Sequence, residues 1–542
     1  MELTAAQITG FVGAQTLVAA RDERGVVSGV CWDSRLVRPG VLFVALAGES
    51  FDGHSFVAQA FELGAAAVLV SRAVGAAELE AAWLCGGALL LVDDGVAALQ
   101  RLAAGYRRML GLTVVGITGS SGKTSTREFV AAVVQEGFEA VASAGNQNNE
   151  IGLPATVLAA GPSTQVLVVE MAMRGLGQIA QLCEIAGPDV GVITNVGTAH
   201  LELLGSRENI ARAKAELIEA LPEGRGVAVL NGDDLFMPFV VEVARAQARG
   251  VSVVTYGLEA HNDVRATGIA YDRNGCASFE LCVGDVARQG LLSYTGCVNS
   301  SQPLDSGSGA GVTMGDINSE LRVSTTDVVQ VRLGVPGRHS VYNALAAVAV
   351  GLSLGMPIEL IVQGLEGTRA APMRQAHYAL DNGMLVIDDT YNANPDSMRA
   401  ALEVLGHLDA QRPHVAVLGD MGELGPRAAE LHHELGGELA GCGVDALIVI
   451  GKAALGIAQG ALEAGMDPAG VFCCAELDEV MAALRQFEGR RAIVLVKASR
   501  SMGLERVVEL LIAQHGGGDG TDAGGDGADA GGSETKGEDP RC

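Results

Sequence analysis

The segment that most constrains this chain is VVGITGSSGKTST at residues 114–126, where an apolar run typical of a β-strand leads into a turn of glycine and serine. The turn ends with Gly122, Lys123 and Thr124, and the helix-compatible sequence REFVAAVV follows. Glycines let backbone N–H groups approach phosphate oxygens, lysine supplies a cation for the β- and γ-phosphates, and threonine can ligate magnesium. The segment therefore predicts a phosphate-binding loop between a strand and a helix.

The spacing of this loop departs from the strict G-x-x-x-x-G-K-[ST] pattern, because Ile117 stands at the first glycine position. An ordinary glycine-rich turn is the alternative interpretation, and the apolar strand before the turn argues against it. We expect a nucleotide triphosphate to contact the whole loop: Gly119, Ser120, Ser121, Gly122, Lys123, Thr124 and Ser125.

Composition and charge limit the possible partners of the chain. The net charge of −27 comes from 37 basic and 64 acidic side chains, and it argues against a nucleic-acid partner, whose phosphates need a basic surface. The sequence contains neither an apolar run near the roughly 18 residues of a membrane span nor the basic start of a signal peptide. We expect a cytoplasmic monomer, and we expect the ten cysteines to carry no disulfide or zinc site.

Alternating strand-like and helix-like segments predict three α/β domains, since 542 residues are too many for one core. Residues 1–112 form a small α/β unit, and residues 113–371 form a mostly parallel sheet covered on both faces, with a loop insertion at about 294–320 between antiparallel strands. Residues 372–515 resemble a Rossmann-type αβα domain. The acidic, glycine-rich tail 516–542 has no apolar face and is expected to be disordered.

Polar residues follow two further apolar runs of the second domain. The run VLVVE ends in Glu170, and VGVITNV leads to His200. If the strand of the phosphate loop is their neighbour, both side chains face one crevice and offer magnesium an oxygen and an imidazole ligand. A solvated carboxylate and a capping or core histidine are the alternatives. Lys214, in the amphipathic helix ENIARAKAELIEAL, is by itself more typical of a solvent-exposed lysine.

An ordered set of motifs between about residues 30 and 510 resembles the Mur ligase family. These are DSR (33–35), VLFVALAGESFDGHSF (41–56), TGSSGKTST (118–126), GNQNNEIGLP (145–154), EMAMRGLG (170–177), ITNVGTAHLELLGSRENIARAKAEL (193–217), PGRHSVYNALAA (336–347), DDTYNANPDSM (388–398), VLGDMGELG (417–425) and KASRSMGLE (497–505). The resemblance implies an N-terminal domain for a UDP-linked substrate, a central ATPase domain, and a C-terminal domain for the amine substrate.

Within this family, TYNANPDSM with GNQNNEIG and LGDMGELG implies ATP-dependent addition of D-alanyl-D-alanine to UDP-N-acetylmuramoyl-tripeptide, a step of peptidoglycan precursor synthesis. The DYAHTPD-like and DNPR motifs of the preceding ligase are missing, as is the AHNP-like motif of folylpolyglutamate synthetases. The implied route activates the peptide carboxylate as an acyl phosphate. Another amino-acid-adding member of the family, a P-loop phosphotransferase and a non-catalytic nucleotide-binding scaffold are the alternatives.

The resemblance also implies two magnesium ions and an ATP site. Thr124 and Glu170 would hold one ion, and His200 would hold the second together with a carbamate formed by CO₂ on Lys214. ATP would further contact Asn343, Asp388, Tyr391 and Asn392, with Arg374 reaching the phosphates from the third domain. Two departures from the family pattern are Ser340, in place of an asparagine, and EMAMRG, in place of an EMGA-like form.

The same resemblance assigns the two substrates. The UDP-linked substrate would contact Ser34, Arg35, Glu49 and His54 in the first domain, and Asn148, Asn149 and Asn394 would lie against substrate elsewhere. The cationic Lys497 and Arg500, with Ser499, would bind the carboxylate of D-alanyl-D-alanine. Asp420 or Glu423 would position or deprotonate the amine, with helix N-terminal acids as the alternative interpretation of both.

Overall fold

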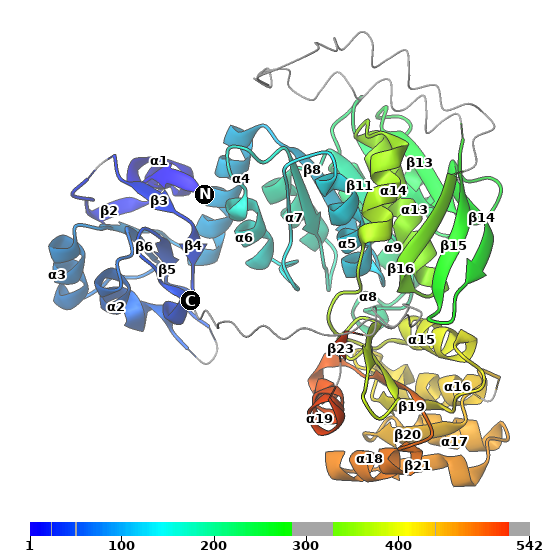
Figure 1. Cartoon of the computed structure of the whole chain (residues 1–542). Helices are drawn as coiled ribbons and strands as arrows, with labels where there is room; N and C mark the ends of the chain where they lie inside the picture. The colour runs from blue at the N-terminus through cyan, green and yellow to red at the C-terminus, as the bar shows by residue number, and fades with distance from the viewer. Residues whose placement is uncertain (23, 49–50, 285–328, 440, 517, 520–542) are drawn as a thin grey trace, which may run out of the picture.

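The computed structural model describes residues 1–22, 24–48, 51–284, 329–439, 441–516 and 518–519. Three α/β units follow one another along the chain, coloured blue, cyan to green, and yellow to red in Figure 1. The expected insertion at 294–320 lies outside the described residues.

The N-terminal unit contains a five-stranded sheet in the order β2-β7-β6-β5-β4, formed by Gln15–Val18, Ala88–Leu91, Ala67–Val70, Leu42–Val44 and Val30–Cys31. Strands β4 to β7 are parallel and β2 is antiparallel. Helices α1 (Ala5–Val12), α2 (Val57–Glu62) and α3 (Ala76–Cys85) surround it, and β1 (Glu2–Thr4) pairs separately with β3 (Val26–Ser28). The first helix begins at a capping box of Thr4 and Gln7, which satisfies N–H groups that the helix cannot bond itself.

Helix α4 (Gly95–Leu110) joins this unit to the central one. It packs against α1 on one side and against α6 and α7 on the other, so the apolar cores of the two units form one continuous cluster. The buried hydroxyl of Tyr106 donates a hydrogen bond of 2.9 Å to the carbonyl of Ala160, which fixes α4 to the end of α6. Shared apolar burial of this kind holds the two units together.

The central unit contains a nine-stranded sheet in the order β16-β15-β14-β13-β12-β11-β8-β10-β9. The strands are Val329–Pro336, Cys276–Val283, Val264–Tyr271, Ser252–Gly257, Val227–Asn231, Val190–Ile193, Thr113–Thr118, Val166–Glu170 and Ala140–Ala142. All pairs are parallel except β14 with β15 and β15 with β16. This confirms the predicted mostly parallel sheet with antiparallel strands at one end.

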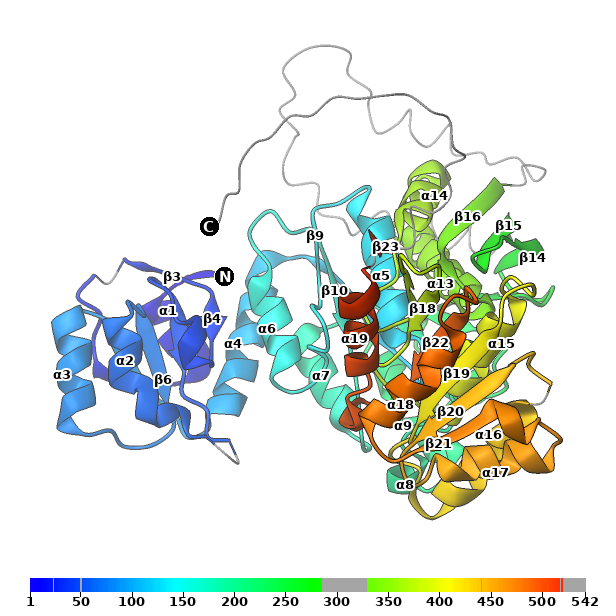
Figure 2. The ribbon, with the colours of Figure 1, turned by 60° about the horizontal axis from the view of Figure 1, so that its bottom comes forward.

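Helices cover both faces of this sheet (Figures 1 and 2). Helices α5 (Lys123–Gln135), α13 (Arg338–Ser353) and α14 (Ile358–Gly367) lie on one face, and α6 (Gly152–Ala159), α7 (Gln178–Ala186) and α9 (Arg207–Glu219) on the other. Short helices α8 (Leu201–Leu204) and α10 (Met237–Val243) complete the unit. Val115 of β8 packs in the core on the face covered by α5, α13 and α14, and its neighbour Val114 packs in the core on the opposite face. The two differ because successive strand residues point to opposite faces of a sheet.

The C-terminal unit is an αβα layer structure with strand order β21-β20-β19-β22-β18-β17-β23. The strands are Val471–Cys474, Ala446–Ile450, His414–Gly419, Ile493–Lys497, Leu385–Asp388, Ala376–Ala379 and Gly518–Asp519, and only the last two pairings are antiparallel. Helices α15 (Pro395–His407), α16 (Ala428–Leu439) and α17 (Leu455–Glu463) lie on one face, with α18 (Leu477–Leu484) and α19 (Glu505–His515) on the other. Strand β23 lies within the segment that the sequence predicts to be a disordered tail.

No helix in the described part of the chain combines the length and apolar character needed to cross a bilayer. The eight cysteines among the described residues are free thiols.

Candidate active site

The strand order of the central sheet brings the predicted polar residues to one edge. Strand β8, which carries the phosphate loop, lies between β10 and β11. Glu170 is the last residue of β10, and His200 follows β11 at the start of α8. All three strands are parallel, so their carboxyl ends open into the same crevice, where ligands of such sheets bind.

The phosphate loop is held by side chains that come after β11. The carbonyl of Ser121 accepts a hydrogen bond of 2.6 Å from the hydroxyl of Thr194, and the backbone N–H of Ser121 donates one of 3.0 Å to Asn195 Oδ1. Gly122 has φ 76° at the start of α5, a conformation that suits glycine. Lys123 Nζ lies 2.8 Å from the carbonyl of Gly119, which turns the lysine back over its own loop.

Glu170 is the most firmly fixed group of the site. Its side chain is 2% exposed and accepts hydrogen bonds of 2.8 Å from the Thr124 hydroxyl and from Asn148 Nδ2. Arg127 NH1 lies 3.9 Å away and donates a hydrogen bond of 2.8 Å to the carbonyl of Gly145. The carboxylate therefore joins the phosphate-loop helix to the loop that contains Asn148.

Lys214 is buried, contrary to what its helix alone suggests. It is 1% exposed and has no hydrogen-bond or ion-pair partner within the described ranges. Burial lowers the pKa of its ammonium group well below the usual value, and the nearby charge of Lys123 lowers this pKa further. Burial is likewise the main cause of the lowered pKa of Lys123. The charge of Glu170 acts in the opposite direction, and that of Arg374 lowers this pKa further.

His200 lies beside the C-terminal unit. Its Nδ1 is 2.8 Å from Oε2 of Glu423, and Arg174 is 3.9 Å from the same carboxylate. His200 and Glu423 both have left-handed backbones, with φ of 63° and 59°, which is uncommon for residues with side chains. Burial lowers the pKa of His200, while the negative charge of Glu423 acts in the opposite direction.

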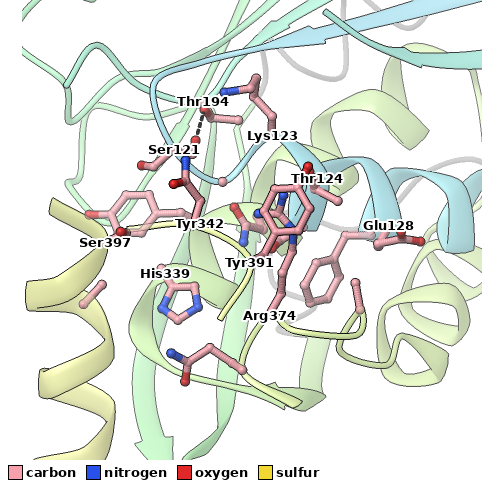
Figure 3. A pocket seen from close by; sticks show the side chains of 18 of the residues that line it. Ser121, Lys123, Thr124, Glu128, Thr194, His339, Tyr342, Arg374, Tyr391 and Ser397 are labelled. Atoms are coloured by element: carbon pink, nitrogen blue, oxygen red, sulfur yellow. Dashed lines mark hydrogen bonds between the residues drawn. The ribbon is translucent and has the colours of Figure 1, made fainter. Parts of the chain in front are cut away.

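A cavity of about 400 Å³ lies beside the phosphate loop, between the central and C-terminal units (Figure 3). Most of the residues predicted for ATP line it, together with several predicted for metal or substrate. These are Ser120, Ser121, Gly122, Lys123, Thr124, Ser125, Asn148, Glu170, Asn343, Arg374, Tyr391, Asn392, Asn394 and Lys497.

Asn343 is the residue of this cavity with an unsatisfied donor. It is 6% exposed, and its Oδ1 accepts a hydrogen bond of 3.0 Å from the Thr126 hydroxyl. Its Nδ2 has no partner among the residues that the structure describes. Burial of an amide N–H group without a hydrogen-bond partner costs free energy. This donor therefore fits a ligand that offers an acceptor, such as a purine base.

On the C-terminal side of the cavity, Asp389 rather than the predicted Asp388 is the aspartate that lines the cavity. Asp388 ends β18 and accepts hydrogen bonds of 3.1 and 2.6 Å from the backbone and hydroxyl of Thr390, so its carboxylate is turned away. Asp389 lines the cavity and pairs with Lys497 Nζ at 2.7 Å. Lys497 is 2% exposed and also donates to the carbonyl of Asn392 at 2.9 Å, which places it on the nucleotide side of the domain.

Asp420 is occupied by contacts within the C-terminal unit. Its Oδ1 accepts a hydrogen bond of 2.8 Å from the backbone of Ala454 at the start of α17, an arrangement that the alternative interpretation as a helix N-terminal acid describes. Ser499 is 5% exposed and accepts from the backbone of Gly422 at 2.6 Å. Arg500 remains half-exposed and pairs with Glu505 at 3.0 Å, so of these three predicted residues it is the most accessible.

The structure describes three of the four residues predicted for the UDP-linked substrate, Ser34, Arg35 and His54. Arg35 is 86% exposed and pairs with Asp33, and Ser34 begins the same single helical turn. His54 is buried, with Nδ1 at 2.7 Å from Asp52 and Nε2 accepting from the Ser71 backbone at 3.0 Å, which is typical of a structural histidine. Glu49 lies outside the described residues.

A second cavity, of about 380 Å³, lies between α4 and the central unit. It shares Ala172 with the first cavity, and the loop with Asn148 and Asn149 separates the two. Asn149 lines the second cavity and caps α6 by accepting from the Gly152 backbone at 2.9 Å. The two cavities thus lie next to each other, with this loop between them.

Sequence reasoning missed part of the lining of the first cavity. The residues are Glu128, Asn195, His339, Tyr342, Gln375, Asp389, Asp396 and Ser397. His339 and Tyr342 flank Asn343 in one helix, and Asp389, Asp396 and Ser397 belong to the DDTYNANPDSM motif, so the motifs already contained these five. Asn195 likewise lies within the motif at 193–217, and Glu128 and Gln375 lie outside the quoted motifs.

The donor set fits one magnesium ion better than two. Thr124 and Glu170 offer a hydroxyl and a carboxylate 2.8 Å apart at the phosphate loop, the oxygen ligands that magnesium prefers. Among the described residues, no three His, Cys, Asp or Glu side chains gather as a metal cluster. A second ion near His200 would therefore need a further ligand, and the neutral amine that burial favours at Lys214 is the form that reacts with CO₂.

Comparison with known proteins places the three units in one family. Residues 26–107 match the model of the Mur ligase family, catalytic domain, residues 117–351 the Mur ligase middle domain, and residues 373–500 the Mur ligase, glutamate ligase domain.

Curated and solved relatives resemble the chain over most of its length. The UDP-N-acetylmuramoyl-tripeptide--D-alanyl-D-alanine ligase of Bacillus subtilis is 35% identical over 497 residues, 92% of this chain and 96% of the relative. A crystal structure of MurF from Acinetobacter baumannii has a TM-score of 0.77 at 30% identity and covers 95% of this chain and 99% of its own. The MurF ligase of Thermotoga maritima in complex with ADP has a TM-score of 0.71 at 28% identity, covering 90% and 98%.

Proposed function

Because the chain belongs to the Mur ligase family, we propose that it catalyses the ATP-dependent joining of D-alanyl-D-alanine to UDP-N-acetylmuramoyl-tripeptide, a step in building the peptidoglycan precursor. The observation that carries this proposal is the similarity to ligases of that name over almost the whole chain. The convergence of Lys123, Glu170 and Arg374 on one cavity supports it physically.

The first step joins two anions and therefore needs concentrated positive charge. A carboxylate oxygen of the tripeptide attacks the γ-phosphorus of ATP, ADP leaves, and an acyl phosphate forms. Lys123 and Arg374 offer their cations to the phosphates from opposite domains, and Asn343 offers its free Nδ2 to the base. Magnesium held by Thr124 and Glu170 would neutralise phosphate charge further.

A carbamate on Lys214 is the second part of the proposal. The unprotonated amine reacts with CO₂ to give a carbamate and a proton, which turns a buried cationic side chain into an oxygen ligand. The depressed pKa of Lys214 and its lack of a partner support this modification. His200 would be the other protein ligand, provided that its imidazole exchanges Glu423 for the ion.

In the second step, the amine nitrogen of the dipeptide attacks the acyl carbon, phosphate leaves, and the nitrogen loses a proton. Arg500 is the accessible cation for the dipeptide carboxylate, since it is half-exposed whereas Lys497 is buried. Glu423 is better placed than Asp420 to hold the ammonium group, because it reaches His200 across the domain boundary.

We infer that the UDP-linked substrate approaches the phosphate loop past the second cavity. This cavity lies at α4 and shares Ala172 with the ATP cavity. We propose that the enzyme acts as a monomer. ATP and a UDP-activated substrate are cytoplasmic metabolites, so we assign the enzyme to the cytoplasm.

Phosphate release tests the proposal directly. The purified enzyme receives ATP, magnesium and UDP-N-acetylmuramoyl-tripeptide, with either D-alanyl-D-alanine or single amino acids as the amine. Release of phosphate and formation of the amide only with the dipeptide are expected. Turnover with a single amino acid alone would assign the chain to another amino-acid-adding ligase. A phosphorylated product without an amide would instead indicate a phosphotransferase.

A further inference from the structure

The guanidinium of Arg374 has one partner among the residues that the structure describes, the aromatic ring of Tyr391. Its guanidinium carbon lies 3.9 Å from the centroid of that ring, and Figure 3 shows the two side chains stacked in the cavity. Among the described residues the guanidinium has no ion pair and no hydrogen bond, and the Tyr391 hydroxyl has no hydrogen bond. A cation over an aromatic face is attracted by the ring quadrupole without using its N–H donors.

The backbone has an uncommon conformation on both sides of Arg374. Met373 and Gln375 have left-handed conformations with φ of 60° and 57°, which cost energy for residues other than glycine. The carbonyl of Met373 accepts from the Tyr391 backbone at 3.1 Å, and Gln375 Nε2 donates to Asp389 at 2.9 Å. The segment between the central and C-terminal units is therefore fastened on both sides of the arginine.

Arg374 faces the same ligand groups as the phosphate loop. It lines the cavity with Lys123, and its charge opposes protonation of that lysine. Glu170, which also lines the cavity, acts on Lys123 in the opposite direction. The repulsion between the two cations would be relieved by an anion bound between them.

We propose that Tyr391 is a positioning residue whose ring, and not its hydroxyl, holds Arg374 in place for the phosphates of ATP. This inference rests on the proposed function, because it assumes that the phosphates of ATP occupy the cavity. It differs from the expectation that Tyr391 itself contacts the nucleotide. The hydroxyl is then dispensable, and the role of the ring depends on the presence of Arg374.

A double-mutant cycle with ATP binding as the readout separates these roles. Tyr391→Phe keeps the ring and is expected to retain ATP affinity within about twofold, whereas Tyr391→Leu is expected to weaken it by about 3- to 30-fold. In an Arg374→Ala background, Tyr391→Leu is expected to add less than about a twofold change. Calorimetric titration with ATP, together with unchanged far-ultraviolet circular dichroism, provides the measurement.

Two results would overturn the inference. If Tyr391→Phe weakens ATP binding as much as Tyr391→Leu, the hydroxyl contacts the nucleotide directly. If the effects of Tyr391→Leu and Arg374→Ala simply add, or if Tyr391→Leu has no effect, the ring does not act through the arginine. Titration with ATP needs neither the tripeptide nor the dipeptide, so a failure of the proposed ligase reaction in the phosphate-release assay would be recognised separately.

Discussion

Replacing Lys214 by methionine should raise the stability of the protein while it abolishes turnover. The side chain is 1% exposed, and its amine has no hydrogen-bond or ion-pair partner among the described residues. Burial of an uncompensated polar group costs about 1–3 kcal/mol, and methionine fills a similar volume without that cost. Removal of the amine also relieves repulsion from Lys123, which is larger than the attraction to Asp234 that is lost with it. A gain of this size corresponds to a rise in Tm of about 2–12 °C for a domain of this length.

The pH dependence of this gain has a definite sign. The pKa of Lys214 is lowered in the folded state, so the unfolded chain binds more protons below the usual lysine pKa of 10.5. Stability of the wild type therefore falls as the pH decreases from that value towards the lowered pKa. Between about pH 9 and about pH 7.5, the advantage of Lys214→Met should grow by up to about 2 kcal/mol.

Thermal unfolding in metal-free buffer depleted of bicarbonate provides the measurement, because a carbamate would change the charge of the lysine. Phosphate release by Lys214→Met should fall by about 100-fold or more. Lys214→Ala is the matched variant, since the smaller residue leaves space for formate or acetate to restore part of the activity. A lower Tm of Lys214→Met than of the wild type, or an advantage that grows with rising pH, would refute the reasoning. Normal activity of Lys214→Ala would refute the carbamate.

Three further predictions concern single contacts. Arg127→Met should lower kcat by about 10- to 100-fold, because it removes the buried cation that orients Glu170, and Arg127→Lys should recover part of this loss in the phosphate-release assay. Gly119→Ala should weaken ATP binding by at least about tenfold in calorimetric titration, since its added Cβ would lie 1.7 Å from Thr194 Oγ1 and would displace the loop. Tyr106→Phe should lower the free energy of unfolding by about 1–2 kcal/mol, measured as a lower Tm with unchanged activity, because it breaks the buried hydrogen bond between α4 and the end of α6.

Much of the architecture could be predicted because it depends on local patterns. The strand, glycine turn and helix around Lys123 form a continuous segment whose periodicity and turn residues are visible in the sequence. Glu170 and His200 could be placed at one edge of the sheet once their strands were taken as neighbours of β8, and the strand order confirms that arrangement. The ordered motifs are also local patterns of residues, and they indicated the Mur ligase family.

Local sequence determined the phosphate loop, the sequence of strands and helices, and the residue types available for phosphate chemistry. Tertiary structure decided which of these side chains face the cavity. Adjacent aspartates in one motif differ in this respect, because Asp388 is turned towards Thr390 whereas Asp389 meets Lys497 from a strand more than a hundred residues away. Burial of Lys214 likewise depends on how its helix packs on the sheet, and amphipathic spacing alone does not specify that environment.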